Sequence, residues 1–168
     1  KTRLKCFVTG IEFDKDSAAF AQKIYDEVFI IKLEELINNT YRFETKIKYD
    51  YIIFGDILEH VTKPEYLLEY FSKFLKTDSF IIASIPNIAN WMIRIKLLLG
   101  NFDYSGGILD ITHLKFFTYK SPKKLLEDAG YKIILVVNNN HTWLFKFLGK
   151  YCKSLFAFQF VFKCRKTI

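Results

Sequence analysis

Three side chains suited to acid–base or metal chemistry follow one apolar run near the middle of the chain. The run Tyr51–Phe54 ends in a glycine, and Asp56, Glu59 and His60 come directly after it. In a turn or short helix, residues three and four apart share a face, so these side chains can act together. Carboxylates and an imidazole are ligands for a divalent cation, and the imidazole can instead act as a general base. A structural interpretation also stands, with Asp56 as a helix cap, Glu59 exposed and His60 packed.

A second imidazole, His113, lies beside Asp110 in the stretch LDITHLKFF. The following Phe116 and Phe117 can anchor this segment in the core, which leaves His113 free to reach across the mouth of a site. We therefore take Glu59, His60 and His113 as the candidate catalytic residues. The third histidine, His141, has no pattern around it, and we expect it at the surface or in a cap.

Glu12 ends an apolar stretch and is the candidate for binding a nucleoside. In open parallel sheets, ligands lie beyond the carboxyl ends of the strands, where Glu12, Asp56 and Pro86–Asn87 are expected. A carboxylate has two oxygens and suits the two hydroxyls of a ribose. An acid at the end of a strand can equally be a plain solvated residue, so Glu12 alone does not decide between these roles.

The hydrophobic periodicity predicts alternating strands and helices. The expected strands are Cys6–Asp14, Val28–Ile31, Tyr49–Asp56, Phe80–Ile85, Tyr131–Asn138 and Phe156–Cys164. The expected helices are Asp16–Val28, Lys63–Asp78, Ile88–Gly100, Ser121–Tyr131 and Trp143–Tyr151, with Asp16 and Ser121 as N-caps. This order predicts an α/β fold, Rossmann-like, with a mostly parallel sheet, and residues 1–168 as a single domain.

Composition limits the class of protein. The 168 residues are 51% hydrophobic and 18% aromatic, which excludes a disordered chain. Cys6, Cys152 and Cys164 show neither disulfide nor zinc-finger spacing, so we expect a reducing, cytoplasmic location. No apolar run is long enough to span a bilayer, although the aromatic stretch Thr142–Phe162 leaves peripheral membrane contact open.

The net charge of +7 allows attraction to phosphate, nucleic acid or anionic membranes, or serves solubility alone. No basic run is dense enough to indicate a nucleic-acid arm, so nucleic acid is possible as a partner but not favoured. The sequence does not indicate an oligomeric state.

Several stretches, in this order, resemble the class I S-adenosylmethionine-dependent methyltransferases. They are VTGIEFDKDSAAFAQ, YDYIIFGDILEHVTKPEYLLEYFSKFLKTDSFIIASIPNIANW and GILDITHLKFFTYKSPKKLLEDAGY. The resemblance implies a seven-stranded sheet whose last strand is antiparallel, with S-adenosylmethionine as cofactor. It is greatest to the branch with LEH and GILDxTHxxFFT motifs, which implies O-methylation of a small-molecule or sugar hydroxyl.

The same resemblance implies roles for single residues. Glu12 falls on the ribose-binding acid of the family, and Phe13 falls on the position that flanks the adenine. Gly55 and Asp56 fall where the family lines the methionine side of the cofactor. Pro86–Asn87 matches the segment that faces the substrate.

A narrower resemblance concerns plant small-RNA 2′-O-methyltransferases. These enzymes have an acid-x-x-Glu-His pattern after the corresponding strand and a distant histidine followed by aromatic residues, which Asp56, Glu59, His60 and His113 match. This resemblance implies that the four side chains hold a divalent metal, which positions hydroxyl groups and lowers the pKa of one. Metal binding, base catalysis by histidine and a structural role all remain open for the group.

One departure from the family concerns its glycine-rich loop. The loop and its strand should precede FVTGIEFD, but only KTRLKC does so here, and the sequence contains no Gly-x-Gly. The first strand and helix of the fold are therefore expected to be missing from this chain. The chain can be a piece of a longer one, receive the strand from another chain, or be a relative that no longer binds the cofactor. Lys32 stands where relatives often have an acid near the adenine.

A non-catalytic binding protein and an RNA 2′-O-methyltransferase are the rival functions.

Overall fold

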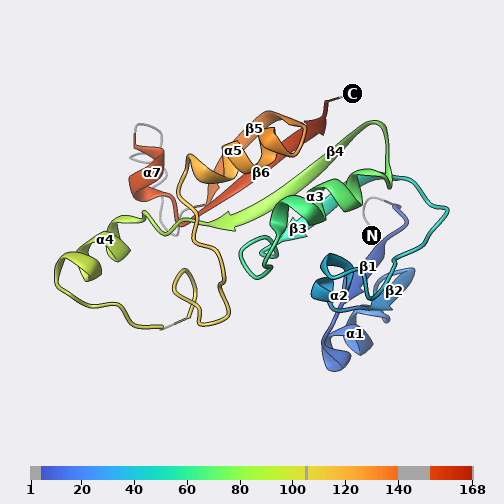
Figure 1. Cartoon of the computed structure of the whole chain (residues 1–168), viewed down its shortest axis with the longest axis horizontal. Coiled ribbons are helices and arrows are strands. Elements are labelled where there is room, and N and C mark those ends of the chain that lie inside the picture. Colours follow the sequence, from blue (N-terminus) through green and yellow to red (C-terminus); the bar gives the residue numbers. More distant parts are fainter. Residues whose placement is uncertain (1–4, 105, 140–151, 168) are drawn as a thin grey trace. The chain divides into compact units, whose positions relative to one another are not determined.

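The computed structural model describes residues 5–104, 106–139 and 152–167. It divides into two compact units, Lys1–Glu44 and Thr45–Ile168 (Figure 1). The predicted helix Trp143–Tyr151 and the third histidine, His141, lie outside the described residues. None of the helices in the described ranges is long and apolar enough to cross a membrane.

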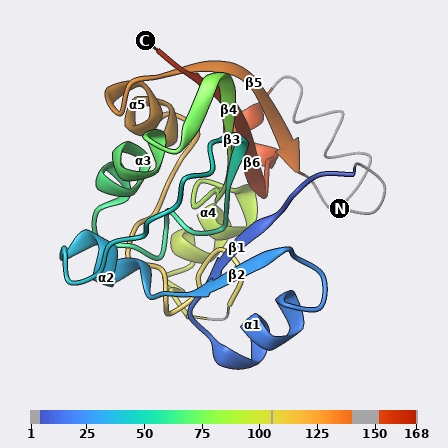
Figure 2. The same cartoon turned by 90° about the vertical axis from the view of Figure 1, so that its right-hand side faces the viewer.

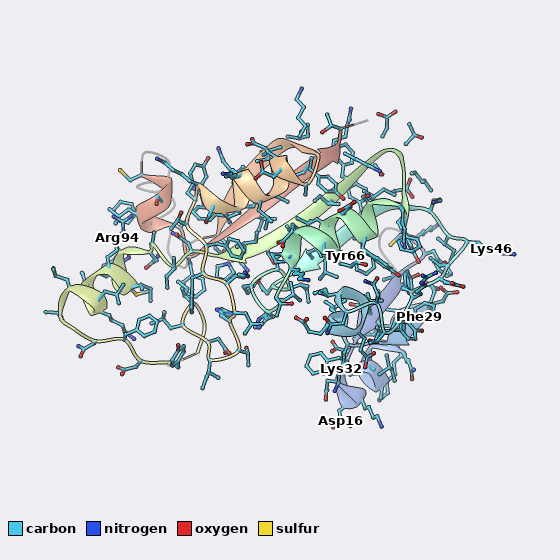
Figure 3. The ribbon with its side chains drawn as sticks, in the orientation of Figure 1. Asp16, Phe29, Lys32, Lys46, Tyr66 and Arg94 are labelled. Atoms are coloured by element: carbon cyan, nitrogen blue, oxygen red, sulfur yellow. The ribbon has the colours of Figure 1, made fainter. Side chains whose placement is uncertain are left out.

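The first unit contains a small parallel sheet with two helices. Its elements are β1 (Thr9–Glu12), α1 (Lys15–Ala21), β2 (Glu27–Ile30) and α2 (Leu33–Ile37). β1 and β2 pair in parallel, with Thr9 opposite Glu27 and Glu12 opposite Ile30. The ring of Phe29, labelled in Figure 3, packs edge-on against Phe43 at a centroid distance of 5.0 Å.

The N-cap of α1 is Asp14, whereas the sequence predicted Asp16. Asp14 is in an extended conformation, and its Oδ1 accepts a hydrogen bond from the backbone N–H of Ser17 at 2.8 Å. Asp16 is already inside the first helical turn, where its charge complements the helix dipole. The helix is also shorter than expected, because the chain has to turn before β2 begins at Glu27.

The second unit is built on a four-stranded sheet with the order β3-β4-β6-β5. Its elements are β3 (Tyr49–Gly55), α3 (Pro64–Ser72), β4 (Leu75–Pro86), α4 (Trp91–Leu98), α5 (Ser121–Asp128), β5 (Tyr131–Asn139), α7 (Lys153–Phe156) and β6 (Gln159–Lys166). β3 and β4 are parallel, and β6 is antiparallel to both of its neighbours. The predicted α/β fold with an antiparallel last strand is confirmed.

One face of this sheet forms the core of the second unit. Alternate residues of the two central strands are buried, as period-two patterning requires. They are Ile81, Ala83 and Ile85 of β4 and Phe160, Phe162 and Cys164 of β6. Helices α3 and α5 lie on the same side of the sheet (Figure 2). The buried hydroxyl of Tyr131 in β5 donates to the carbonyl of Leu68 in α3 at 2.9 Å and ties sheet to helix.

The opposite face of the sheet is exposed. Ile53 of β3 is 68% exposed and Leu135 of β5 is 53% exposed. Ile82 and Lys163 lie between them in the same row across the sheet. Within the described ranges, β3 pairs with β4 alone, and β1 pairs with β2 alone. The described strands therefore number six in two sheets, where the family resemblance implied seven.

Two predicted boundaries near α3 and α5 were wrong. α3 ends at Ser72, because β4 begins at Leu75, well before the predicted Phe80. An irregularity in the β3–β4 register takes up the residues between. Ser121 is the first residue of α5 and not its cap, and its hydroxyl accepts a hydrogen bond from the backbone N–H of Thr118 at 2.9 Å.

Candidate active site

β3 ends in a sharp turn at Asp56, where the sequence predicted that the site begins. Asp56 has a φ of 52°, in the left-handed region that few residues other than glycine adopt. Its backbone N–H donates to the hydroxyl of Ser84 at 3.0 Å, and that hydroxyl donates back to Oδ1 at 3.1 Å. The amide of Gln159 also donates to Oδ1. Strain at a strand end that neighbouring strands hold in place is typical of functional sites.

The stretch DILEH forms a turn, one of the two conformations expected for it. The backbone N–H of His60 donates to the carbonyl of Ile57 at 3.0 Å. Leu58 is fully buried and anchors the turn in the core. Because the segment is not helical, side chains three and four apart are not brought onto one face by a helix.

A clasp between two backbone segments brings the two histidines together. The carbonyl oxygen of Glu59 accepts hydrogen bonds from the N–H groups of Leu114 at 2.8 Å and Lys115 at 3.0 Å. His113 therefore lies against His60, with ring centroids 4.6 Å apart and planes at 70°. The prediction that the distant histidine reaches this turn agrees with this geometry.

The Glu59 side chain is buried, and no described residue forms a hydrogen bond with its carboxylate. It is 1% exposed, and neither carboxylate oxygen has a hydrogen-bond partner among the described residues. Burial, helped by the negative charge of Asp56, raises the pKa of the Glu59 carboxyl from 4.5 to about 7. A buried polar group without a partner is costly, so its presence suggests that something else binds there.

Glu59, His60 and His113 each offer one ligand atom, and these three atoms lie within 4.8 Å of one another. A carboxylate and two imidazoles fit a divalent transition metal ion, which binds at about 2 Å from each ligand. Asp56 was predicted as a fourth ligand. The group does not include Asp56, whose Oδ1 accepts hydrogen bonds from Ser84 and Gln159.

Hydrogen bonds at Nδ1 orient both imidazoles. The Nδ1 of His113 lies 3.0 Å from the carbonyl of Ile108, and the Nδ1 of His60 lies 3.2 Å from the carbonyl of Thr112. A carbonyl can only accept, so we assign the ring proton to Nδ1 in both residues. The Nε2 atoms then carry the lone pairs that can bind a metal or accept a proton.

The loop that carries His113 is organised by Asp110. The Oδ1 of Asp110 accepts hydrogen bonds from the hydroxyl of Thr112 at 2.5 Å and from its N–H at 2.9 Å. These bonds hold the pKa of the Asp110 carboxyl below its usual value. The sequence analysis missed a role for Thr112, although Asp-x-Thr is a spacing at which an aspartate binds the backbone two residues on.

The predicted cofactor residues at the end of β1 have groups available for a ligand. The Oε1 of Glu12 accepts from the N–H groups of Phe13 at 2.8 Å and Asp14 at 3.1 Å. Oε2 has no partner in the part of the chain that the structure describes. The ring of Phe13 is 65% exposed, as a stacking surface has to be.

Gly55 leaves the backbone at the end of β3 open to close approach. A Cβ added there would meet no atom within 4 Å. The neighbouring Asp56 is exposed, and its Oδ2 has no partner among the described residues. Both features fit the predicted location beside a bound cofactor.

Asn87 has a structural position that the sequence analysis did not foresee. It is fully buried, its Nδ2 donates to the carbonyls of Ser154 and Ala157, and its Oδ1 accepts from the N–H of Ala89. Asn90 is the N-cap of α4 and donates to the same carbonyl of Ala157 at 3.0 Å. These two amides fasten the segment before β6 to the end of β4, so the Asn87 side chain does not face a substrate.

Comparison with known proteins identifies the family. Residues 5–136 match the family model described as a methyltransferase domain, and the chain belongs to that family. The predicted class of enzyme, a methyltransferase, is therefore confirmed. Among curated proteins, no match to the sequence is found.

Solved structures share the fold at low sequence identity. A Thermotoga maritima methyltransferase, described as a possible histamine N-methyltransferase, is 17% identical with a TM-score of 0.65, over 98% of this chain and 75% of that one. An S-adenosylmethionine-dependent methyltransferase from Archaeoglobus fulgidus is 17% identical with a TM-score of 0.60, over 94% and 75%. Magnesium protoporphyrin IX methyltransferase from Synechocystis, with S-adenosylhomocysteine bound, is 14% identical with a TM-score of 0.64, over 98% and 66%. Because their described acceptors differ, these structures indicate the fold and not the acceptor of this chain.

The raised pKa of Glu59 predicts how stability depends on pH in the absence of metal. The unfolded carboxyl ionises near pH 4.5 and the folded one near 7, so the folded state binds more protons between these values. Stability therefore falls as pH rises through this window and stays reduced above it, by roughly 2–3 kcal/mol. Glu59→Gln removes the ionisation, so we expect it to be more stable than wild type at pH 8 but not at pH 4. Urea unfolding in EDTA at a series of pH values measures this, with Glu65→Gln on the exposed side of α3 as control. Parallel pH profiles for wild type and Glu59→Gln would contradict the assignment.

Proposed function

We propose that this domain transfers the methyl group of S-adenosylmethionine to a hydroxyl group of a small molecule or sugar. The observation that supports this most is the meeting of the Glu59 carboxylate with the imidazoles of His60 and His113 just beyond β3. Ligands of open α/β sheets bind at this end of the strands. A hydroxyl group must lose its proton when it is methylated. Side chains at this position that can bind a proton or a cation therefore suit a hydroxyl as the methyl acceptor.

The chemical task of the site is to make a weak nucleophile competent. The hydroxyl oxygen attacks the methyl carbon, the carbon–sulfur bond breaks, and the sulfonium becomes a neutral thioether. The hydroxyl proton passes to the Nε2 of His60 or His113, whose Nδ1 atoms are already bonded to carbonyls. Positioning supplies the rest, because the transfer itself needs only an aligned approach of oxygen to methyl.

The same three residues fit a divalent cation. Glu59, His60 and His113 would hold it, and the bound cation would supply positive charge that lowers the pKa of a nearby hydroxyl. The two unpartnered oxygens of Glu59 are the feature that favours this, since a cation removes the cost of burying the ionised carboxylate. Direct proton transfer to histidine and cation binding are the two arrangements that this cluster supports.

In each of the two units, two residues have groups that suit one portion of the cofactor. The free Oε2 of Glu12 suits a ribose hydroxyl, and the exposed ring of Phe13 suits the adenine face. The open backbone at Gly55 and the free Oδ2 of Asp56 suit the methionine portion, whose α-amino group needs an acceptor. These roles follow the family resemblance, and the geometry of each residue is compatible with them.

RNA 2′-O-methylation is the second candidate, supported by the same three-ligand cluster and the net charge of +7. A ribose hydroxyl presents the same chemistry as a sugar hydroxyl, so the acceptor distinguishes the two functions. Binding to RNA that weakens steeply with salt would favour the second candidate.

The two histidines are predicted to contribute to the rate of methyl transfer. His113→Ala and His60→Ala each remove a Nε2 lone pair, and we expect each to lower kcat by about 10²–10⁴-fold with a small change in KM. Transfer of a labelled methyl group by the full-length protein to sugar, small-molecule and RNA acceptors measures this. Lys115→Ala is the matched control, because only its backbone N–H joins the clasp with Glu59. An unchanged kcat in both histidine variants would remove them from the chemistry.

Metal binding is predicted to stabilise the protein. Manganese or zinc at about a hundredfold excess over Kd should raise the Tm of EDTA-treated protein by roughly 5 °C or more. Glu59→Gln and His60→Ala should lose this rise, whereas Asp56→Asn should keep it, because Asp56 lies outside the three-ligand group. A wild-type Tm that no divalent ion moves would leave proton transfer to histidine as the supported arrangement.

Glu12 is predicted to contribute to cofactor affinity. Replacing it by alanine removes a charge-assisted hydrogen bond, and we expect S-adenosylmethionine to bind about 10–100-fold more weakly. Calorimetric titration of the full-length protein measures this, with Asp16→Ala, an exposed acid that does not cap α1, as control. If wild type releases no heat of binding, the non-catalytic binding protein becomes the better interpretation.

A further inference from the structure

We propose that Thr112, held in place by Asp110, is a positioning residue that keeps the Nε2 atom of His60 free of its proton. The inference deepens the proposed function. It rests on that function only in assuming that the Nε2 lone pair of His60 accepts the proton of the acceptor hydroxyl or binds a cation. Nothing in the comparisons with known proteins assigns a role to either residue.

The Thr112 hydroxyl has one proton, and it donates this proton in a hydrogen bond to the Asp110 carboxylate. The two oxygens, Thr112 Oγ1 and Asp110 Oδ1, lie 2.5 Å apart, which is the length of a charge-assisted bond. An ionised carboxylate has no proton to give, so the hydroxyl is the donor. The oxygen of Thr112 is then left as an acceptor only.

His60 meets that acceptor with its Nδ1. The distance from Nδ1 to Thr112 Oγ1 is 3.1 Å, and the carbonyl of Thr112 lies 3.2 Å from the same atom. Two acceptors at one ring nitrogen stabilise the form with the proton on Nδ1. A histidine side chain in water favours the other neutral form, with the proton on Nε2. The loop therefore reverses the intrinsic preference of the ring.

Asp110 also fixes the backbone around Thr112. Its Oδ1 accepts the N–H of Thr112 at 2.9 Å, and its carbonyl accepts the N–H of His113 at 3.1 Å. Asp110 therefore holds the Thr112 side chain in one orientation and also accepts the hydrogen bond from its hydroxyl. Asp110 acts on His60 through Thr112, and in the described part of the chain it makes no hydrogen bond of its own to the ring.

His113 gives an internal reference, because its tautomer depends on a different contact. Its Nδ1 donates to the carbonyl of Ile108 at 3.0 Å, with no part for Thr112. A change confined to the Thr112 hydroxyl should therefore affect His60 and leave His113 as it was. A general loosening of the loop would affect both.

The test is the tautomer of each ring, read by two-bond ¹H–¹⁵N NMR correlations on labelled full-length protein without metal. At about pH 8.5, where imidazoles are ordinarily neutral, wild type should show the proton on Nδ1 in both His60 and His113. Thr112→Val keeps the shape but loses the hydroxyl, so the ratio of Nδ1–H to Nε2–H in His60 should fall about three- to tenfold. His113 should be unchanged, and Thr112→Ser should restore the wild-type ratio.

Two further variants guard the interpretation. Thr118→Val makes the same chemical change on the same loop and should leave both tautomers unchanged. Asp110→Ala frees the Thr112 hydroxyl to donate to Nδ1 and should shift His60 in the same direction as Thr112→Val, which keeps the proposal testable if that variant does not fold. In turnover assays, Thr112→Val should lower kcat and leave KM near wild type.

The proposal is overturned if wild-type His60 carries its proton on Nε2, or if Thr112→Val leaves the His60 ratio unchanged. Absence of methyl transfer in the wild-type protein, with the NMR pattern as expected, would contradict the proposed function and leave the positioning role standing.

Discussion

The candidate site depends on the hydrogen bonds that one carbonyl, that of Glu59, accepts from Leu114 and Lys115. They join the turn after β3 to a loop far along the chain. Among the described residues, these are the backbone–backbone hydrogen bonds that hold the turn of Glu59 and His60 against the loop of His113. Each amide bond of this kind contributes about 1 kcal/mol, which is modest for stability. Its consequence for the site is larger, because it sets the 4.6 Å separation of the two rings.

The same residue shows a contrast between its main chain and its side chain. The carbonyl of Glu59 accepts two hydrogen bonds, whereas both carboxylate oxygens are buried without a donor among the residues that the structure describes. A folding optimum would place an apolar residue here, since burying an unpaired carboxyl costs stability. Local conflict of this kind, in a surrounding that is otherwise satisfied, is expected where function and not stability has selected the residue.

The sequence was informative where local pattern decides the structure. The apolar runs that became β3 and β4 were recognisable because parallel strands are typically almost continuously hydrophobic, although one face of β3 is exposed here. The position of Asp56 followed from the end of such a run. The hydrogen-bond partners of Asp56 could not be predicted in this way. Gln159 lies 103 residues away in the sequence and is brought close by the antiparallel pairing of β6 with β4. The sequence pattern and the family resemblance counted Asp56 among the metal ligands, whereas the described cluster of possible ligands contains Glu59, His60 and His113.

Long-range contacts also explain why the role of one loop could not be foreseen in full. Residues 108–115 supply His113, the carbonyl that orients it, the acceptors that orient His60, and the two N–H groups of the clasp. The stretch LDITHLK thus has several tasks, of which only the presence of a histidine and two following aromatic residues was visible in the sequence. Because the tasks share one short segment, displacing the loop would remove the second imidazole and the orientation of the first together. A site assembled in this way should be lost or retained as a unit, since His60 and His113 are positioned by the same few residues.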